Sequence, residues 1–187
     1  MIRDSALAVS GALIASNGGP ALSPEFMENV GGLNPKDVNP ISFSLTKFRE
    51  EQHRVRTIYL PVVRSSEQRG PADVLNFFDF AQPARFTGER PTTAVASQSL
   101  FLLNGPLLAE AARKLAETIL GDTTLATDDD RLAAVYLRVL GRTPGPEDVQ
   151  GVRTFLASEP EIADKPAQGW QRLVHALLAS NEFLFRL

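Results

Sequence analysis

Helical spacing of apolar residues in the last third of the chain predicts three amphipathic helices. Apolar side chains at i, i+3, i+4, i+7 and i+8 fall on one face of an α-helix, and this spacing occurs over residues 132–140 and 170–178. Residues 149–156 carry apolar side chains at i, i+3, i+6 and i+7, which also lie on one helix face. Three aspartates at 128–130 precede the first stripe and Gly141 follows it, which are ordinary start and stop signals of a helix. Helices joined by such short connections favour a compact bundle.

Helical patterns also occur upstream of this bundle. A first helix is predicted over residues 2–15, ended by the Asn-Gly-Gly-Pro sequence at 17–20. Shorter helices are predicted at 23–30 and 71–78, and a regular apolar stripe at 108–120 predicts another, ended by Gly121. Residues 97–103 are so densely apolar that we expect a helix buried on most sides, broken at residues 104–106 by Asn-Gly-Pro.

Extended structure is predicted at one place, residues 56–63, where β-branched and aromatic residues gather. Pro61 restricts this segment to an edge strand, and no second segment of similar quality could pair with it. The predicted fold class is therefore mostly α: a compact multi-helix bundle with irregular loops and at most one or two short strands. We predict a single helical domain over residues 1–187, with possible sub-units at 1–90 (irregular and helical) and 91–187 (helical bundle).

Composition excludes several classes of function. The 19 basic and 22 acidic residues give a net charge of −3, which argues against a nucleic-acid-binding protein. The absence of cysteine excludes disulfides, thiolate metal sites and covalent haem attachment within this chain. Two uncharged stretches, 5–24 and 91–109, are too interrupted for membrane spans, and the first is predicted to be an amphipathic helix rather than a signal peptide.

Familiar catalytic and metal-binding patterns are also absent from the sequence. Neither His53 nor His175 has a partner at metal-ligand spacing, so both are predicted to be structural or surface residues. The three aspartates at 128–130 lack the alternate spacing of a calcium loop. We predict no catalytic residue, no metal site and no cofactor in this chain.

The most unusual region is a polar set around the predicted strand and the loop that follows it. Arginine, tyrosine and asparagine on loops beside apolar helices can bind sugars or carboxylates. The structural alternative is that these residues form ion pairs and helix caps. The candidate ligand-binding residues are Arg56, Tyr59, Arg64, Asp79, Arg90, Thr92, Thr93, Gln98 and Asn104.

Several segments resemble the planctomycete cytochrome-associated proteins grouped as domain-of-unknown-function family 1553. The matching sequences are IRDSALAVSG at 2–11, GGP at 18–20, RTIYLPVVRS at 56–65, FFDFAQP at 77–83, RPTTAVASQSLFLLN at 90–104 and LVHALLASNEFLF at 173–185. Residues 136–149 (YLRVLGRTPGPEDV) also resemble a helical unit that recurs in sibling domains of the same proteins. The sequence departs from the family pattern at Ala96 and Ser97, where relatives often have Pro-Thr.

This resemblance implies that the chain is the C-terminal part of a longer exported protein, periplasmic or secreted. Relatives typically carry an export signal, often a haem c domain, and other helical domains upstream. The first functional hypothesis is a non-catalytic helical interaction module that docks on those upstream domains or on a partner. The alternatives are an extracellular polysaccharide-binding or -processing domain that uses the polar region 56–104, and a docking partner of a c-type cytochrome domain. The last would use residues 47–90, where eight basic and six acidic residues give a net of +2.

Overall fold

The computed structural model describes residues 2–15, 54–60, 73–81, 86, 88, 95–158 and 166–185. The chain forms two compact units, one of Met1–Ala12 with Ser99–Leu187 and the other of Leu13–Gln98. Every regular element in the described ranges is a helix, so the predicted mostly α class is confirmed. The prediction of one domain with sub-units at 1–90 and 91–187 stays a prediction.

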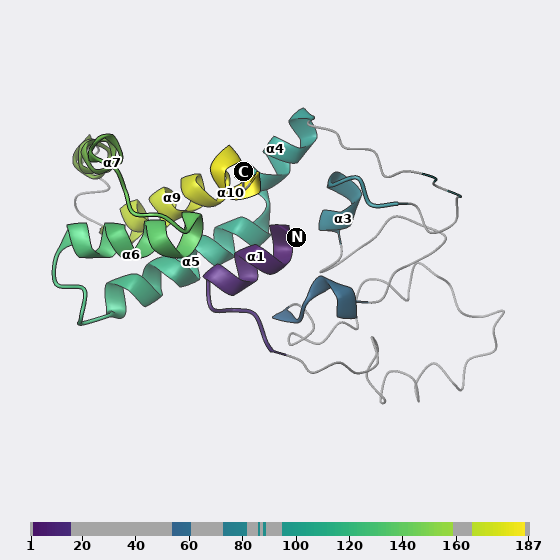
Figure 1. Ribbon diagram of the computed structural model, residues 1–187, viewed down its shortest axis with the longest axis horizontal. Coiled ribbons are helices and arrows are strands. Elements are labelled where there is room, and N and C mark those ends of the chain that lie inside the picture. Colours follow the sequence, from purple (N-terminus) through teal and green to yellow (C-terminus); the bar gives the residue numbers. More distant parts are fainter. Residues whose placement is uncertain are drawn as a thin grey trace. The chain divides into compact units, whose positions relative to one another are not determined.

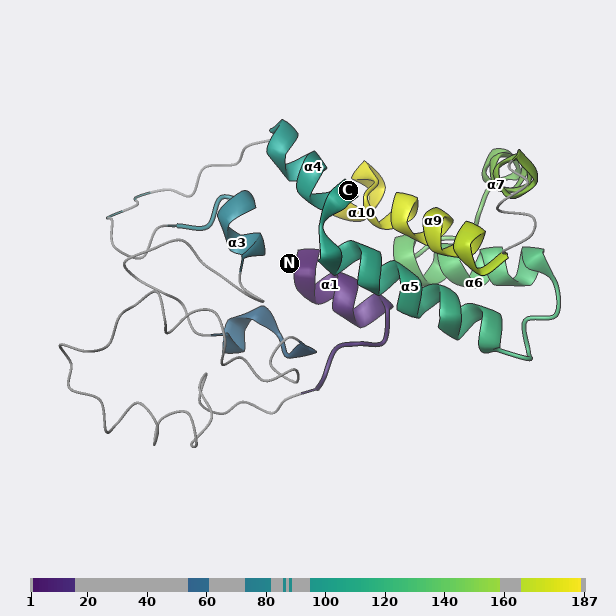
Figure 2. The same ribbon diagram turned by 180° about the vertical axis from the view of Figure 1, so that it is seen from behind.

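The core of the first unit is the close pairing of two helices, α5 (Pro106–Gly121) and α9 (Pro166–Leu178). They lie side by side in both views (Figures 1 and 2). Both helices bury the stripes that the sequence predicts, with Leu115 and Val174 fully inaccessible to solvent. Burying such a side chain contributes roughly 1.5–3 kcal/mol, so this pair is the main source of stability in the unit. The other buried residues of the pair are Leu108, Ala111, Ala112, Ala116, Ile119, Trp170, Leu173 and Leu178.

Four further helices pack around this pair. They are α1 (Ile2–Val9), α6 (Asp128–Leu140), α7 (Pro146–Ser158) and α10 (Asn181–Leu184). Helix α1 packs on α5, α6 packs on both α5 and α9, and α7 and α10 pack on α9. In Figure 1, α7 is seen along its own axis while α5, α6 and α9 lie across the page, so α7 runs in a different direction from these three helices.

The sequence signals at both ends of α6 are confirmed. The Thr127 hydroxyl accepts a hydrogen bond from the Asp130 N–H (3.1 Å), and the Asp130 carboxylate accepts one from the Thr127 N–H (3.0 Å). This reciprocal capping box satisfies two N–H groups that a helix start leaves unpaired. Gly141 ends the helix with a left-handed φ of 71°.

The first helix is shorter than predicted, because it ends at Val9 rather than near residue 15. Gly11 has a φ of 70°, its N–H donates to the Ala8 carbonyl (3.0 Å), and the Ala12 N–H donates to the Leu7 carbonyl (2.8 Å). This pair of bonds is the Schellman arrangement, in which a left-handed glycine closes the helix. The predicted stop at 17–20 and the predicted helix at 23–30 lie outside the described residues.

The strand predicted at 56–63 is wrong for residues 57–59, which form the 3-10 helix η3 (Thr57–Tyr59). The Tyr59 N–H donates to the Arg56 carbonyl (2.9 Å) and the Leu60 N–H to the Thr57 carbonyl (3.1 Å). These local turn bonds satisfy main-chain groups that a strand would have to pair with a neighbour, and no strand lies among the described residues. The short helix predicted at 71–78 is found as α3 (Val74–Phe77).

Candidate functional site

Of the nine predicted ligand-binding residues, the structure describes five. Arg56, Tyr59, Asp79 and Gln98 belong to the second unit and Asn104 belongs to the first. Arg64, Arg90, Thr92 and Thr93 lie outside the described residues. The prediction of a ligand site in this region therefore stays a prediction, and the described members are considered by their contacts.

Two of these residues serve the ends of one helix, α4 (Ala96–Asn104). The Gln98 side chain, which is buried, accepts a hydrogen bond from the Val95 N–H through Oε1 (3.2 Å). At the other end, Nδ2 of Asn104 donates to the Leu100 carbonyl (3.1 Å). The side-chain contacts of Gln98 and Asn104 agree with the structural alternative, in which the polar residues cap helices. Arg56 contributes only its main-chain carbonyl to η3.

Asp79 has the only left-handed backbone among the non-glycine residues that the structure describes, with a φ of 51°. Aspartate adopts this conformation more readily than most residues, because its short side chain can bond locally. The residue is half-buried and follows Phe78, the C-cap of α3. Asp79 therefore lies in the turn just after this short helix, in the left-handed conformation.

Between α4 and α5 the chain makes a tight elbow at Gly105 and Pro106. A proline disfavours helical backbone in the preceding residue, and Gly105 is accordingly extended, with φ −72° and ψ 141°. A Cβ atom on Gly105 would lie only 2.4 Å from the carbonyl oxygen of Phe101, the group that accepts the Gly105 N–H at 2.7 Å. Only glycine fits this elbow without a shift of the main chain.

The elbow deprives the Leu102 carbonyl of its ordinary helical partner. In an uninterrupted helix this oxygen would accept from the N–H of residue 106, but residue 106 is proline and has no N–H. Nε2 of His175, on α9, lies 3.0 Å from the Leu102 oxygen, so the Nε2–H tautomer supplies the missing donor. The prediction that His175 is a structural or surface residue is confirmed as a structural role.

Helix α4 is not buried on most sides, contrary to the expectation from its apolar sequence. Within it only Gln98 and Leu102 are buried, whereas Leu100 and Leu103 expose 59% and 56% of their surface. Its sequence, ASQSLFLLN, contains no charged residue. Apolar density predicted the burial wrongly, because it does not show whether a neighbouring element covers the second face of a helix.

The exposed face of the next helix differs sharply from that of α4. On α5, Arg113 forms ion pairs with Glu110 and with Glu117 (2.5 Å each). The hydrogen bond that Glu110 accepts from Arg113 is the main cause of the lowered pKa of Glu110. Such i, i+3 and i, i+4 pairs are typical of a helix face that meets water. The α4 surface with Leu100 and Leu103, which we call the α4 leucine face, has no such pairs.

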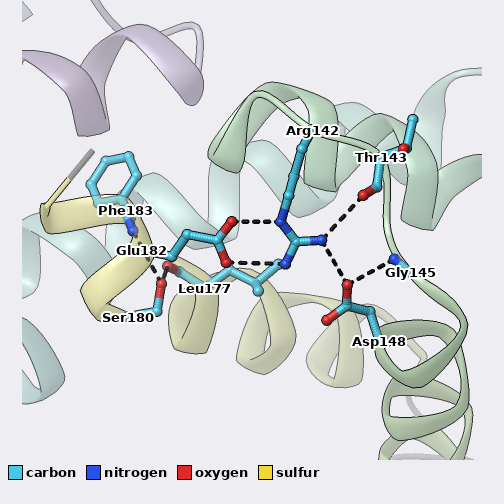
Figure 3. A network of polar contacts seen from close by, with 8 residues as sticks. All are labelled: Arg142, Thr143, Gly145, Asp148, Leu177, Ser180, Glu182 and Phe183. Atoms are coloured by element: carbon cyan, nitrogen blue, oxygen red, sulfur yellow. Dashed lines mark hydrogen bonds and ion pairs between the residues drawn. The ribbon is translucent and has the colours of Figure 1, made fainter. Parts of the chain in front are cut away.

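Arg142 is the centre of a polar network, drawn in Figure 3. Its Nε and Nη2 donate to the two carboxylate oxygens of Glu182 (2.5 and 3.0 Å), forty residues away. Its Nη1 donates to Asp148 (2.7 Å) and to the Thr143 carbonyl (3.1 Å). The guanidinium also lies over the Tyr136 ring, 5.2 Å from the ring centre.

This Arg142 network joins three helices at their ends. Asp148 in the first turn of α7 also accepts the Gly145 N–H (2.8 Å). Glu182 lies in α10, and Arg142 follows Gly141, the C-cap of α6. Hydrogen bonds from Arg142 and from the Gly145 N–H lower the pKa of Asp148, and that from Arg142 lowers the pKa of Glu182. Burial is the main cause of the raised pKa of Tyr136. Since both carboxylates are held by the same guanidinium, we interpret this cluster as a structural clamp.

Neither Arg142 nor Glu182 is among the residues that the sequence predicts to form a site. A signal was nevertheless present, because both lie in segments that resemble family sequences, 136–149 and 173–185. Arg142 and Glu182 stand forty positions apart, so spacing alone could not pair them. Within the described residues no group of three or more His, Asp or Glu side chains is arranged to hold a metal ion.

Taken together, these features describe an arrangement of helices in which several of the described polar side chains cap or join helices. A family model described as "Protein of unknown function (DUF1553)", also called PSD1, matches residues 1–156. The chain therefore belongs to this family. No curated protein and no solved structure matches it. No helix among the described residues is long and apolar enough to cross a membrane.

Proposed function

We propose that this chain is a non-catalytic helical interaction module of a larger exported multidomain protein, and that it docks through the α4 leucine face. The observation that carries the proposal is the exposure of Leu100 and Leu103, 59% and 56%, on a helix without charge. Contiguous exposed apolar surface is typical of protein interaction sites, whereas single exposed apolar residues are ordinary. Leu100 and Leu103 are three residues apart on an uncharged helix, so they are neighbours on one of its faces.

The contacts of the polar residues support the same proposal. Arg142 holds two carboxylates, His175 serves a main-chain carbonyl, and Gln98 accepts a main-chain N–H. Each of these contacts connects or ends helices within the chain. A module of this kind would contribute a rigid scaffold and an apolar docking surface. We infer its partner to be an upstream domain of the same protein, as the family resemblance implies.

A co-purification experiment tests the proposal. The chain is mixed with the separately produced upstream region of its gene product, as wild type and as the double variant Leu100→Glu/Leu103→Glu. We expect the wild type to associate and the double variant to lose association, because burying two carboxylates in an apolar interface is costly. The matched control is Leu137→Glu, which changes an equally exposed leucine on α6 (61%) and should still associate.

Folding of each variant is checked by circular dichroism and by its melting temperature, since all three positions are exposed. Loss of association with an unchanged melting temperature supports docking through the α4 leucine face. Equal association of all three proteins would refute the role of this face. No association of the wild type would refute docking on the upstream region.

A further inference from the structure

Helix α4, which precedes the α4–α5 elbow, is held to the core by fewer buried side chains than α5 or α9. Among the described helices, α5 and α9 form the most extensive packed pair, and α4 takes part in none of the well-packed pairs. Within α4 only Gln98 and Leu102 are buried, and His175 on α9 hydrogen-bonds to the Leu102 carbonyl. Segments with few buried contacts open at a lower free energy than the core that they adjoin.

We propose that residues 99–104 form a separately opening segment and that His175 is the latch that holds it closed. His175 donates to the Leu102 carbonyl, which has no helical donor because Pro106 lacks an N–H. This hydrogen bond therefore replaces the one that the helix loses between α4 and α5. His175 is thus a positioning residue for α4. Its own helix, α9, is held independently by the buried Trp170, Val174 and Leu178.

The physical argument depends on which contacts are lost when the latch opens. Opening breaks one imidazole–carbonyl hydrogen bond and exposes Leu102, while the α5–α9 core keeps all its buried side chains. The extended backbone of Gly105 already ends α4, so opening needs no break within α5. Local opening should therefore occur without unfolding of the bundle.

Amide hydrogen exchange of the whole chain tests the latch, at a fixed pH where the exchange rate follows the open population. The variants are His175→Ala, which removes the donor, and His175→Gln, which places an amide donor near the position of Nε2. A hydrogen bond of ordinary strength corresponds to a factor of about five in the population of the open state. We expect exchange in residues 99–105 to be about five-fold faster in His175→Ala and close to wild type in His175→Gln.

Amides in the middle of α5 and α9 are the internal control. They should exchange at wild-type rates in both variants if the segment opens by itself. Equal acceleration of α4, α5 and α9 in His175→Ala would show that His175 supports the whole core, and would overturn the proposal. The proposal would also be overturned if residues 99–105 of His175→Ala exchanged at the wild-type rate. It would likewise be overturned if these amides exchanged as fast in His175→Gln as in His175→Ala.

Discussion

Gly105→Ala tests whether the geometry of the α4–α5 elbow fixes the residue at this position. The new Cβ would lie 2.4 Å from the Phe101 carbonyl oxygen and 3.4 Å from the Phe101 carbonyl carbon. A main-chain oxygen cannot rotate away as a side chain can, so either the elbow opens or the Gly105–Phe101 hydrogen bond (2.7 Å) lengthens. The backbone angles of Gly105, φ −72° and ψ 141°, suit any residue. The cost is therefore steric rather than conformational.

The magnitude follows from two opposed effects. Overpacking in a site that relaxes poorly costs about 3 kcal/mol. Alanine restricts the unfolded chain more than glycine does, and this effect raises the free energy of unfolding by about 1 kcal/mol. We expect the free energy of unfolding to fall by about 2 kcal/mol, which in a chain of this size lowers the melting temperature by about 4–8 °C.

The control is Gly151→Ala in the middle of α7, where an added Cβ would meet nothing within 4 Å. Alanine there should stabilise the chain by about 0.5–1 kcal/mol, because glycine is unfavourable inside a helix. Urea unfolding followed by circular dichroism measures both variants. If Gly105→Ala is as stable as wild type, or as stable as Gly151→Ala, the reasoning about the elbow is refuted.

Three further predictions concern the rest of the bundle. Thr127→Ala removes the capping box of α6 and should lower the free energy of unfolding by about 1 kcal/mol. Thr118→Ala, on the exposed face of α5, should leave it nearly unchanged. Equal shifts of the melting temperature in the two variants would contradict the role of the cap. In urea unfolding, Leu115→Ala in the core should lower the free energy of unfolding by about 2–5 kcal/mol. Leu137→Ala at the surface should lower it by less than about 0.5 kcal/mol. The lowered pKa of Asp148 implies a contribution to stability that is present above the unfolded value near 3.8 and is lost as the pH falls through the folded value. Asp148→Asn should therefore melt below wild type at pH 7 and approach it below about pH 3.8, and a constant difference across this range would contradict the assignment.

The helical stripes were predictable because one physical pattern determines them. A helix that buries one face must repeat its apolar residues every three or four positions, and α5, α6 and α9 bury those residues. The predicted end of one helix was right and that of another was wrong. Gly141 ends α6 as expected, whereas the first helix ends at Gly11 and not at residue 17, because a left-handed glycine close behind Val9 closes it.

The parts that the sequence did not predict depend on contacts between distant positions. Arg142 and Glu182 are forty residues apart, and His175 and Leu102 seventy-three. Spacing rules concern neighbours within one helix, so they cannot pair such residues. The 3-10 helix at Thr57–Tyr59 was missed for a related reason: β-branched residues favour strands only where a second strand supplies hydrogen bonds.

The exposure of the α4 leucine face links the two proposals by a single energetic argument. A leucine left in water gives up roughly 1.5–3 kcal/mol that burial would contribute, so Leu100 and Leu103 add little to the stability of the isolated chain. Their substitution by glutamate should therefore leave the fold intact while it removes binding. His175→Ala has the opposite signature, because it loosens α4 without changing any side chain on the docking face. A partner that binds only the closed form of α4 loses affinity in proportion to the fraction of molecules in that form. Where the open form is the major population, His175→Ala should therefore weaken binding by about the same factor by which it raises the open population.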